Sequence, residues 1–277
     1  IDIKQRDTLL NPPSYINKWV ITNPPYLAKN KASNLEIFHH YPKYDDLYKI
    51  AIHTLLEAEG GILIVPINFF ADERSKTIRE EFFKHFSILQ LNLFTTQMFE
   101  KTAYNVCSFA FIKITEQTKE VQIPLTIFPQ KQNSILTLSE KGNWRIGGEI
   151  LVQLMKCKNI FSRLTIANPI PKGYITHITI NCIDKINEPL HFYFSDEPYY
   201  GIETDRMLAS FVSCIELDLD MQKQIIDVAN ELITDYRQQC YNMCFTNYRD
   251  KNRKRIGFKE AYAFASLAYT KIINMTD

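Results

Sequence analysis

Residues 20–26 read Val-Ile-Thr-Asn-Pro-Pro-Tyr, an apolar strand end that runs directly into a double-proline turn. Each proline fixes φ at about −65° and lacks a backbone N–H, so the chain cannot continue into a helix here. The turn therefore presents backbone carbonyls together with the side chains of Asn23 and Tyr26. We predict that these groups lie at the carboxyl end of a strand.

The amide of Asn23 and the carbonyl of Pro24 can converge on one small polar group. An exocyclic NH2 on an aromatic ring is a poor nucleophile, and two acceptors that take both of its hydrogens leave its lone pair free to attack an electrophilic methyl group. Tyr26 supplies a face on which a flat ring can stack. The turn thus indicates methyl transfer to a planar amino group, although double-proline turns such as residues 11–14 also follow strands without chemical significance.

The flanking sequence predicts an α/β fold. Residues 60–66 form a continuous apolar run that begins with two glycines, which is typical of a buried strand. The segment 45–59 before it has apolar residues at helical spacing, and Asp45-Asp46 is a plausible N-cap. Strand, turn, helix and strand in this order predict a parallel crossover, in which ligands bind beyond the carboxyl ends of the strands.

With these flanks, Asn23-Pro24-Pro25-Tyr26 resembles the NPPY motif of amino-methyltransferases that use S-adenosylmethionine, most closely the N6-adenine DNA methyltransferases. The resemblance implies that these four residues are catalytic. It also implies a partial Rossmann-like methyltransferase sheet followed by a mixed α+β target-recognition domain. Double-stranded DNA is the implied substrate, with the target adenine flipped out of the duplex.

The resemblance places further residues in the site. A third strand is expected at residues 106–112, and in the loop before it Phe99 matches the aromatic that stacks on the target base together with Tyr26. Asp7, at the end of a strand expected over residues 3–10, matches the acidic residue near the adenine of the cofactor. Contacts to the cofactor are also implied for Asn23 and for Asp46 and Leu47.

The glycine-rich loop that normally holds the cofactor is missing. The chain has eight glycines but no Gly-x-Gly, and it begins at Ile rather than Met. A glycine turn is needed where backbone approaches a ligand closely. We therefore expect the chain to be a fragment of a methyltransferase that lacks its N-terminal cofactor-binding segment.

Three phrases, at residues 104–109, 146–150 and 246–249, look like a subgroup of type II restriction-modification methyltransferases that act on CATG. This similarity implies a cognate restriction endonuclease as a functional partner, without a required contact. The oligomeric state is left open.

We expect a domain boundary near residue 120, where polar residues interrupt two apolar runs. Residues 1–120 would be the catalytic portion and residues 121–277 the target-recognition domain. Short strands are expected in the second part, followed by two helices. The expected strands span residues 121–128, 134–138, 174–182 and 191–194, and the helices residues 218–236 and 258–273.

Between the two helices lies the most basic segment of the chain. Residues 245–260 contain six Lys or Arg against two acidic residues, with aromatics interleaved. Guanidinium groups pair bidentately with phosphate, so this segment is a candidate DNA contact, although a solvated loop between helices would show the same composition. The candidate DNA-binding residues are Tyr248, Arg249, Lys251, Arg253, Lys254 and Arg255.

The bulk composition restricts the partners. Net charge is only +1, so DNA binding must depend on local patches. No run approaches the about 18 apolar residues of a membrane span, and no signal peptide is evident, so we expect a cytoplasmic protein without membrane contact. The six cysteines and six histidines show no metal-ligand spacing. Reduced thiols are expected, even for Cys240 and Cys244, which share a helical face.

Other functions stay open. Methyltransferases that modify RNA or protein glutamine also use NPPY, and N4-cytosine methylation poses the same chemical problem. The long region after the catalytic unit favours DNA. A protein of a different class, a DNA-binding fragment without activity, would bind duplex DNA in a salt-sensitive manner without binding a cofactor.

Overall fold

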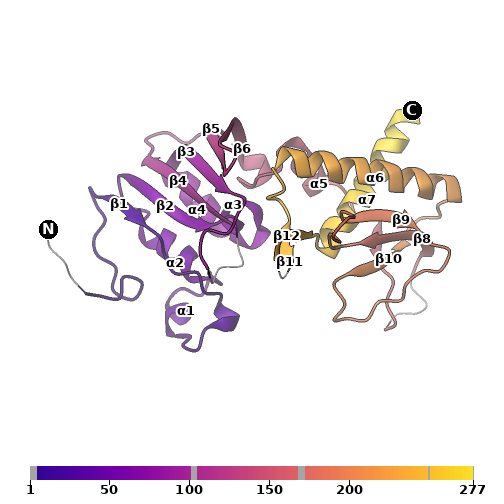
Figure 1. Ribbon diagram of the computed structural model, residues 1–277, viewed down its shortest axis with the longest axis horizontal. Coiled ribbons are helices and arrows are strands. Elements are labelled where there is room, and N and C mark those ends of the chain that lie inside the picture. The colour runs from indigo at the N-terminus through magenta and orange to yellow at the C-terminus, as the bar shows by residue number, and fades with distance from the viewer. Residues whose placement is uncertain (1–4, 101–104, 168–171, 249, 277) are drawn as a thin grey trace. The chain divides into compact units, whose positions relative to one another are not determined.

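The computed structural model describes residues 5–100, 105–167, 172–248 and 250–276. The chain divides into two compact units, Ile1–Ile146 and Gly147–Asp277. Each unit has its own sheet and its own helices (Figure 1). None of the described helices is long and apolar enough to cross a membrane.

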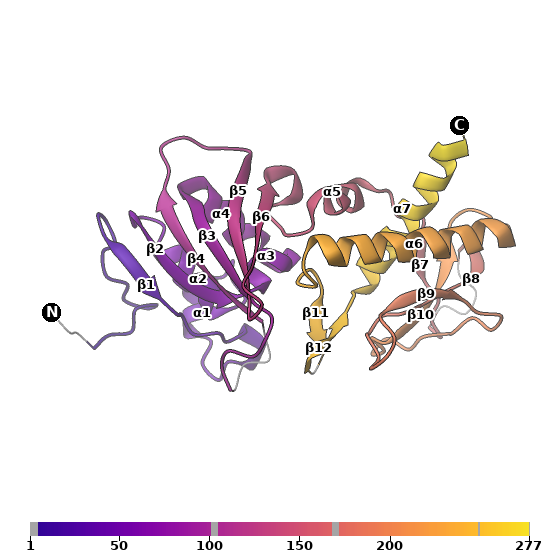
Figure 2. The ribbon, with the colours of Figure 1, turned by 45° about the horizontal axis from the view of Figure 1, so that its top comes forward.

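The first unit is a mixed α/β structure built on a six-stranded sheet in the order β1-β2-β4-β3-β5-β6. Figure 2 shows the strands side by side, from β1 at one edge to β6 at the other. Its elements are β1 Trp19–Thr22, η1 Lys29–Lys31, α1 Glu36–His40, α2 Leu47–Thr54, β2 Gly60–Pro66, α3 Asn68–Ala71, η2 Glu73–Ser75, α4 Lys76–His85, β3 Phe86–Phe94, β4 Val106–Lys113, β5 Glu120–Phe128, β6 Gln132–Ser139 and η3 Glu140–Gly142.

The predicted parallel crossover is confirmed. Strand β1 pairs in parallel with β2, with Val20 opposite Gly61, and helices α1 and α2 lie between them in the chain. A Cβ atom on Gly61 would lie 2.0 Å from the carbonyl oxygen of Val20, so glycine permits the close approach of the two strands. Thr22, the last residue of β1, is therefore fixed beside Leu63, and β2 continues for three residues beyond it.

An aromatic core holds the helices on the sheet. Phe69 of α3, Phe82 of α4 and Phe109 of β4 have ring centroids 5.6–5.7 Å apart, and all three side chains are fully buried. Ring pairs in such arrangements contribute about 0.5–1.5 kcal/mol beyond the burial of their area. Helices α3 and α4 are thereby anchored to the sheet, and α3 begins two residues after β2 ends.

The boundary between the units lies later than residue 120. Strand β5 pairs in parallel with β3, and β6 pairs in antiparallel fashion with β5, so residues 120–139 extend the first sheet. The segment after them is also held to the first unit, since the N–H of Ile146 donates to the carbonyl of Phe70 at 3.0 Å. A polar loop before a further strand of the same sheet has the same composition as a linker, which is why the sequence placed the boundary too early.

The second unit combines a four-stranded antiparallel sheet, in the order β7-β10-β8-β9, with a separate two-stranded hairpin. The long helices α6 and α7 pack against each other and against this sheet (Figure 1). Its elements are α5 Gly148–Lys156, β7 Phe161–Arg163, β8 Tyr174–Asn181, β9 His191–Phe194, β10 Leu208–Ser213, α6 Leu219–Gln239, β11 Thr246–Tyr248, β12 Asp250–Arg255 and α7 Phe258–Thr276.

Two local expectations were wrong. Residues 5–10 do not form a strand end: the carboxylate of Asp7 accepts the N–H groups of Leu9 and Leu10 at 2.9 and 3.0 Å and closes a turn instead. The other expectation was that Cys240 and Cys244 are reduced thiols. They are instead joined by a disulfide, with their Cα atoms 5.6 Å apart where α6 ends. The remaining four cysteines are free.

Candidate functional site

The double-proline turn begins where β1 ends. Asn23 directly follows Thr22, the last residue of β1, as the sequence predicts. Pro24 is buried, Asn23 and Pro25 are exposed, and Tyr26 is half-buried. None of the described residues donates a hydrogen bond to the carbonyl oxygen of Pro24. The turn thus presents the amide of Asn23 at the carboxyl edge of the sheet, next to a Pro24 carbonyl to which no described residue donates.

The hydroxyl of Tyr26 joins this turn to the neighbouring strand. It lies 2.5 Å from Oδ1 of Asn23 and 2.9 Å from the carbonyl oxygen of Ile64 in β2. A phenol carries one proton, so the two acceptors share one donor. Burial raises the pKa of Tyr26 well above its ordinary value, which keeps the hydroxyl protonated and able to donate. The amide of Asn23 is therefore held by its oxygen at a defined place.

Asp46 fixes the segment that follows the turn. As the N-cap of α2, its Oδ1 accepts the N–H of Tyr48 at 3.4 Å, and the same oxygen accepts the N–H of Leu27 at 3.1 Å. The backbone N–H of Leu47 also donates to the carbonyl of Leu27 at 3.1 Å. Burial raises the pKa of Asp46, and these hydrogen bonds only partly offset that rise. The N-cap predicted from the sequence is confirmed, and it clamps the chain next to Tyr26.

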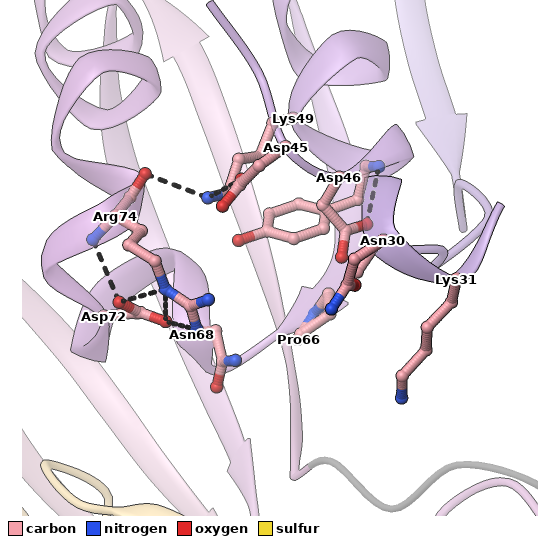
Figure 3. A pocket seen from close by; sticks show the side chains of 11 residues that line it. Asn30, Lys31, Asp45, Asp46, Lys49, Pro66, Asn68, Asp72 and Arg74 are labelled. Atoms are coloured by element: carbon pink, nitrogen blue, oxygen red, sulfur yellow. Dashed lines mark hydrogen bonds and ion pairs between the residues drawn. The ribbon is translucent and has the colours of Figure 1, made fainter. Parts of the chain in front are cut away.

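A pocket of about 170 Å³ lies beside the turn (Figure 3). We call it the side pocket. Its walls come from the loop after Tyr26, the first turn of α2, the end of β2 and the region of α3 and η2. The lining residues are Ala28, Asn30, Lys31, Asp45, Asp46, Tyr48, Lys49, Pro66, Asn68, Asp72 and Arg74.

Ion pairs organise the side pocket. Lys49 is only 4% exposed, and its ammonium lies 2.6 Å from Oδ1 of Asp45 and 2.9 Å from the carbonyl oxygen of Arg74. The guanidinium of Arg74 pairs with Asp72 through Nη2 at 2.7 Å and Nε at 3.1 Å. Burial of Asp72 disfavours its charge, but the bonds from Arg74 outweigh that effect and lower its pKa. The pocket is polar and its acids are largely matched by bases.

The other residues proposed for the site are less closely organised. Phe99 lies in the loop after β3 and is 37% exposed, and none of the described ring contacts includes it. Its carbonyl accepts from Nε2 of Gln97 at 2.8 Å. Asp7 is exposed and occupied with its own turn. The structure does not bring Asp7 or Phe99 into a described contact with Asn23 or Tyr26.

The basic segment of the second unit is a β-hairpin rather than a loop, because β11 and β12 pair across residues 246–255. Asp184 anchors the hairpin: its carboxylate accepts the N–H of Lys254 at 3.0 Å and the N–H of Leu190 at 2.8 Å. It also accepts Nη1 and Nη2 of Arg237 in α6 at 2.8 and 2.9 Å. The hairpin is thereby fixed to α6.

The candidate DNA-binding side chains differ in exposure. Lys254 is 6% exposed, and burial lowers its pKa to about 8, so its ammonium is not presented to a phosphate. Arg253 and Arg255 are half-buried. Tyr248 and Lys251 are described only as strand backbone, and Arg249 lies outside the described residues. Arg253 and Arg255 thus remain the described candidates for phosphate contact.

The sequence analysis missed the residues that follow β2. Asn68, Asp72 and Arg74 line the side pocket, and polar residues directly after a buried strand of an α/β sheet are a signal that could have indicated them. Among the residues that the structure describes, no group of three or more His, Cys, Asp or Glu is placed to hold a metal ion.

Several solved structures are similar to parts of this chain, two of them from type I restriction-modification systems. One is a chain described as the modification subunit of a type I restriction enzyme from Vibrio vulnificus YJ016, with 15% identity and a TM-score of 0.31 over 40% of this chain. The other is a chain from a type I R-M system, with 16% identity and a TM-score of 0.38 over 47% of this chain. The similar regions cover 26% and 28% of those two chains. No protein-family model and no curated protein matches the sequence.

Proposed function

We propose that this chain is part of a DNA methyltransferase that transfers a methyl group from S-adenosylmethionine to N6 of an adenine flipped out of duplex DNA. The observation that carries the proposal is the geometry of the double-proline turn. It combines an amide oxygen held by Tyr26 with the carbonyl of Pro24, to which no described residue donates, both at the end of β1 in a parallel strand pair.

The chemistry follows from these two acceptors. An exocyclic NH2 that donates one hydrogen to Oδ1 of Asn23 and the other to the carbonyl of Pro24 is oriented with its lone pair free. An amide oxygen has two lone pairs, so Asn23 can accept from the amino group while it still accepts from Tyr26. Positioning supplies most of the rate enhancement, because a sulfonium is already an excellent leaving group.

The half-buried ring of Tyr26 is the proposed platform for the flipped base, with Phe99 as the second aromatic. Stacking of a base on an aromatic side chain contributes about 1–3 kcal/mol, comparable to the few kcal/mol needed to extrude the base. Arg253 and Arg255 of the basic hairpin are the proposed phosphate contacts. The CATG target and protection from a cognate endonuclease belong to the same proposal and rest on the sequence resemblance.

S-adenosylmethionine is proposed from the sequence resemblance. The described residues do not by themselves build a pocket for it, because the carboxylate of Asp7 is engaged with the backbone N–H groups of Leu9 and Leu10, and Oδ1 of Asp46 with those of Leu27 and Tyr48. What this chain contributes in the proposal is the orientation of the methyl acceptor.

The deciding experiment measures transfer of labelled methyl from S-adenosylmethionine to duplex DNA by the full-length protein that carries this chain, with the modified base identified by mass spectrometry. N6-methyladenine in the product is the expected result. N4-methylcytosine, or label in RNA or protein glutamine, would replace the substrate class. Salt-sensitive duplex binding without any transfer would select a DNA-binding protein without activity.

A further inference from the structure

The side pocket adjoins the place proposed for the target base. Ala28 of its wall is two residues after Tyr26, and Pro66 is two residues after Ile64, whose carbonyl accepts from the Tyr26 hydroxyl. A strand whose adenine stacks on Tyr26 must continue on both sides of that base. The sugar and phosphate groups next to the flipped nucleotide therefore pass close to this pocket.

The acids of the side pocket are already satisfied from within. Asp45 is paired with Lys49 and Asp72 with Arg74. Asp46 has its Oδ1 on two backbone N–H groups, and its charge lies at the N-terminus of α2, where the helix dipole favours an anion. Repulsion of an incoming anion by these carboxylates is thus reduced.

Donors remain at the opening. Figure 3 shows Lys31 extending from the rim, with Asn30 beside it and Asn68 and Arg74 across the pocket. No described residue forms an ion pair with Lys31, and none accepts a hydrogen bond from Nη1 of Arg74 or from the amides of Asn30 and Asn68. An ammonium, a guanidinium N–H and two amide NH2 groups around one opening match the acceptor oxygens of a phosphate.

We propose that the side pocket binds a phosphodiester group of the strand that carries the target base, with Lys31 as its charged contact and Asn30, Asn68 and Arg74 as hydrogen-bond donors. This inference rests on the proposed function, because it takes DNA as the substrate. It adds a site in the first unit to the basic hairpin of the second. The contact would fix the register of the strand so that the flipped adenine meets Asn23.

Two substitutions test the proposal in the full-length protein. Lys31→Gln removes one positive charge from the pocket, and Lys29→Gln removes one from the same 3₁₀ helix at a residue that does not line the pocket. Binding to a fluorescent CATG duplex is measured over a range of salt concentrations. We expect Lys31→Gln to reduce the slope of log K against log salt by about one, as for the loss of one phosphate contact, and Lys29→Gln to leave it near wild type.

A scan with single uncharged methylphosphonates along the target strand identifies the phosphate. Neutralising one phosphate should weaken binding of the wild type but not of Lys31→Gln. Equal salt slopes for the wild type and Lys31→Gln, or the same methylphosphonate profile in both, would overturn the proposal. So would weaker binding of S-adenosylmethionine by Lys31→Gln with an unchanged DNA slope, since the pocket would then belong to the cofactor.

The methyl-transfer assay separates this proposal from the proposed function. Transfer with an unchanged slope refutes the phosphate site and leaves the enzyme in place. A reduced slope without transfer keeps the phosphate site and removes the catalytic assignment.

Discussion

The hydroxyl of Tyr26 lies 2.5 Å from the amide oxygen of Asn23, within the same tetrapeptide. The residue proposed to stack on the base therefore also holds the residue proposed to orient its amino group. An amide that rotates freely about its last torsion accepts from a substrate in only part of its conformations, so the contact pre-organises Asn23. The roles proposed for the Tyr26 ring and for its hydroxyl can be separated by substitution.

Tyr26→Phe keeps the ring and removes the hydroxyl. We expect kcat for methyl transfer to fall by about fivefold, the effect of a net hydrogen bond of about 1 kcal/mol, while DNA affinity stays near wild type. Tyr26→Ala should additionally weaken DNA binding, because stacking is lost. Steady-state kinetics on both variants separate the two effects. A Tyr26→Phe variant with unchanged kcat would show that the hydroxyl contact does not matter for the reaction.

Asn23→Ala removes the amide altogether. Loss of one preorganised hydrogen-bonding group in a site costs about 10²–10³ in kcat, so transfer should fall to the limit of detection while duplex binding persists. Asn23→Asp is the matched control of similar shape, and it keeps an oxygen for Tyr26 but adds a charge. Methyl transfer by Asn23→Ala at the wild-type rate would refute the role of the turn.

The sequence predicted the crossover and the turn because both depend on local signals. The two prolines after Asn23 restrict the backbone wherever they occur, and a continuous apolar run such as that of β2 is typical of a buried strand. Strand β3 was missed although residues 89–93, Leu-Gln-Leu-Asn-Leu, alternate as a half-buried strand does; only Ile88-Leu89, where the register shifts, departs from that pattern. Hairpin β11–β12 was missed because it is polar throughout, and its position depends on Asp184, which is distant in sequence.

The side pocket could not be predicted from the sequence for a similar reason. Its lining comes from three separate stretches of chain, residues 28–31, 45–49 and 66–74, and the pairing of Asp72 with Arg74 and of Asp45 with Lys49 decides its charge. A sequence shows these residues only as scattered polar positions. Which acids are neutralised, and which donors remain, depends on distances that only the folded chain defines.

Ile21 of the edge strand β1 is 82% exposed, and Trp19 on the same face is 67% exposed. An apolar edge strand is a site for pairing with another chain. We expect Ile21→Lys to reduce concentration-dependent self-association of the 277-residue chain, measured by sedimentation velocity. Folding stability should change by less than about 0.5 kcal/mol, because the site is on the surface.

Ile135 of the opposite edge strand, β6, is the control for this effect, since it is 66% exposed but its neighbours on the same face of the strand, Asn133 and Thr137, are polar. Ile135→Lys should alter self-association less than Ile21→Lys. Equal effects of the two variants would mean that general charge, rather than the β1 edge, controls association.

The carboxylate of Asp184 joins α6 to the basic hairpin through Arg237 and the N–H of Lys254. Removal of one partner of such a buried pair leaves the other uncompensated, so Asp184→Ala should lower the free energy of unfolding by about 3 kcal/mol in a urea titration. Arg253 and Arg255 lose their support, and DNA affinity should fall with stability. Unchanged stability would show that the hairpin is held by other contacts.

The same carboxylate predicts a pH dependence. Burial alone would raise the pKa of Asp184, but the bonds from Arg237, Leu190 and Lys254 outweigh it and hold the pKa below the ordinary value of 3.8. The unfolded chain therefore takes up the proton first as pH falls, so this contribution is complete above about pH 4 and is lost through the lower folded pKa. The measurement is the urea midpoint between pH 3 and 7, at pH values where both proteins fold. The midpoint of the wild type should fall more steeply at the acid end than the midpoint of Asp184→Asn. Parallel curves for the two proteins would mean that other carboxylates account for the acid sensitivity.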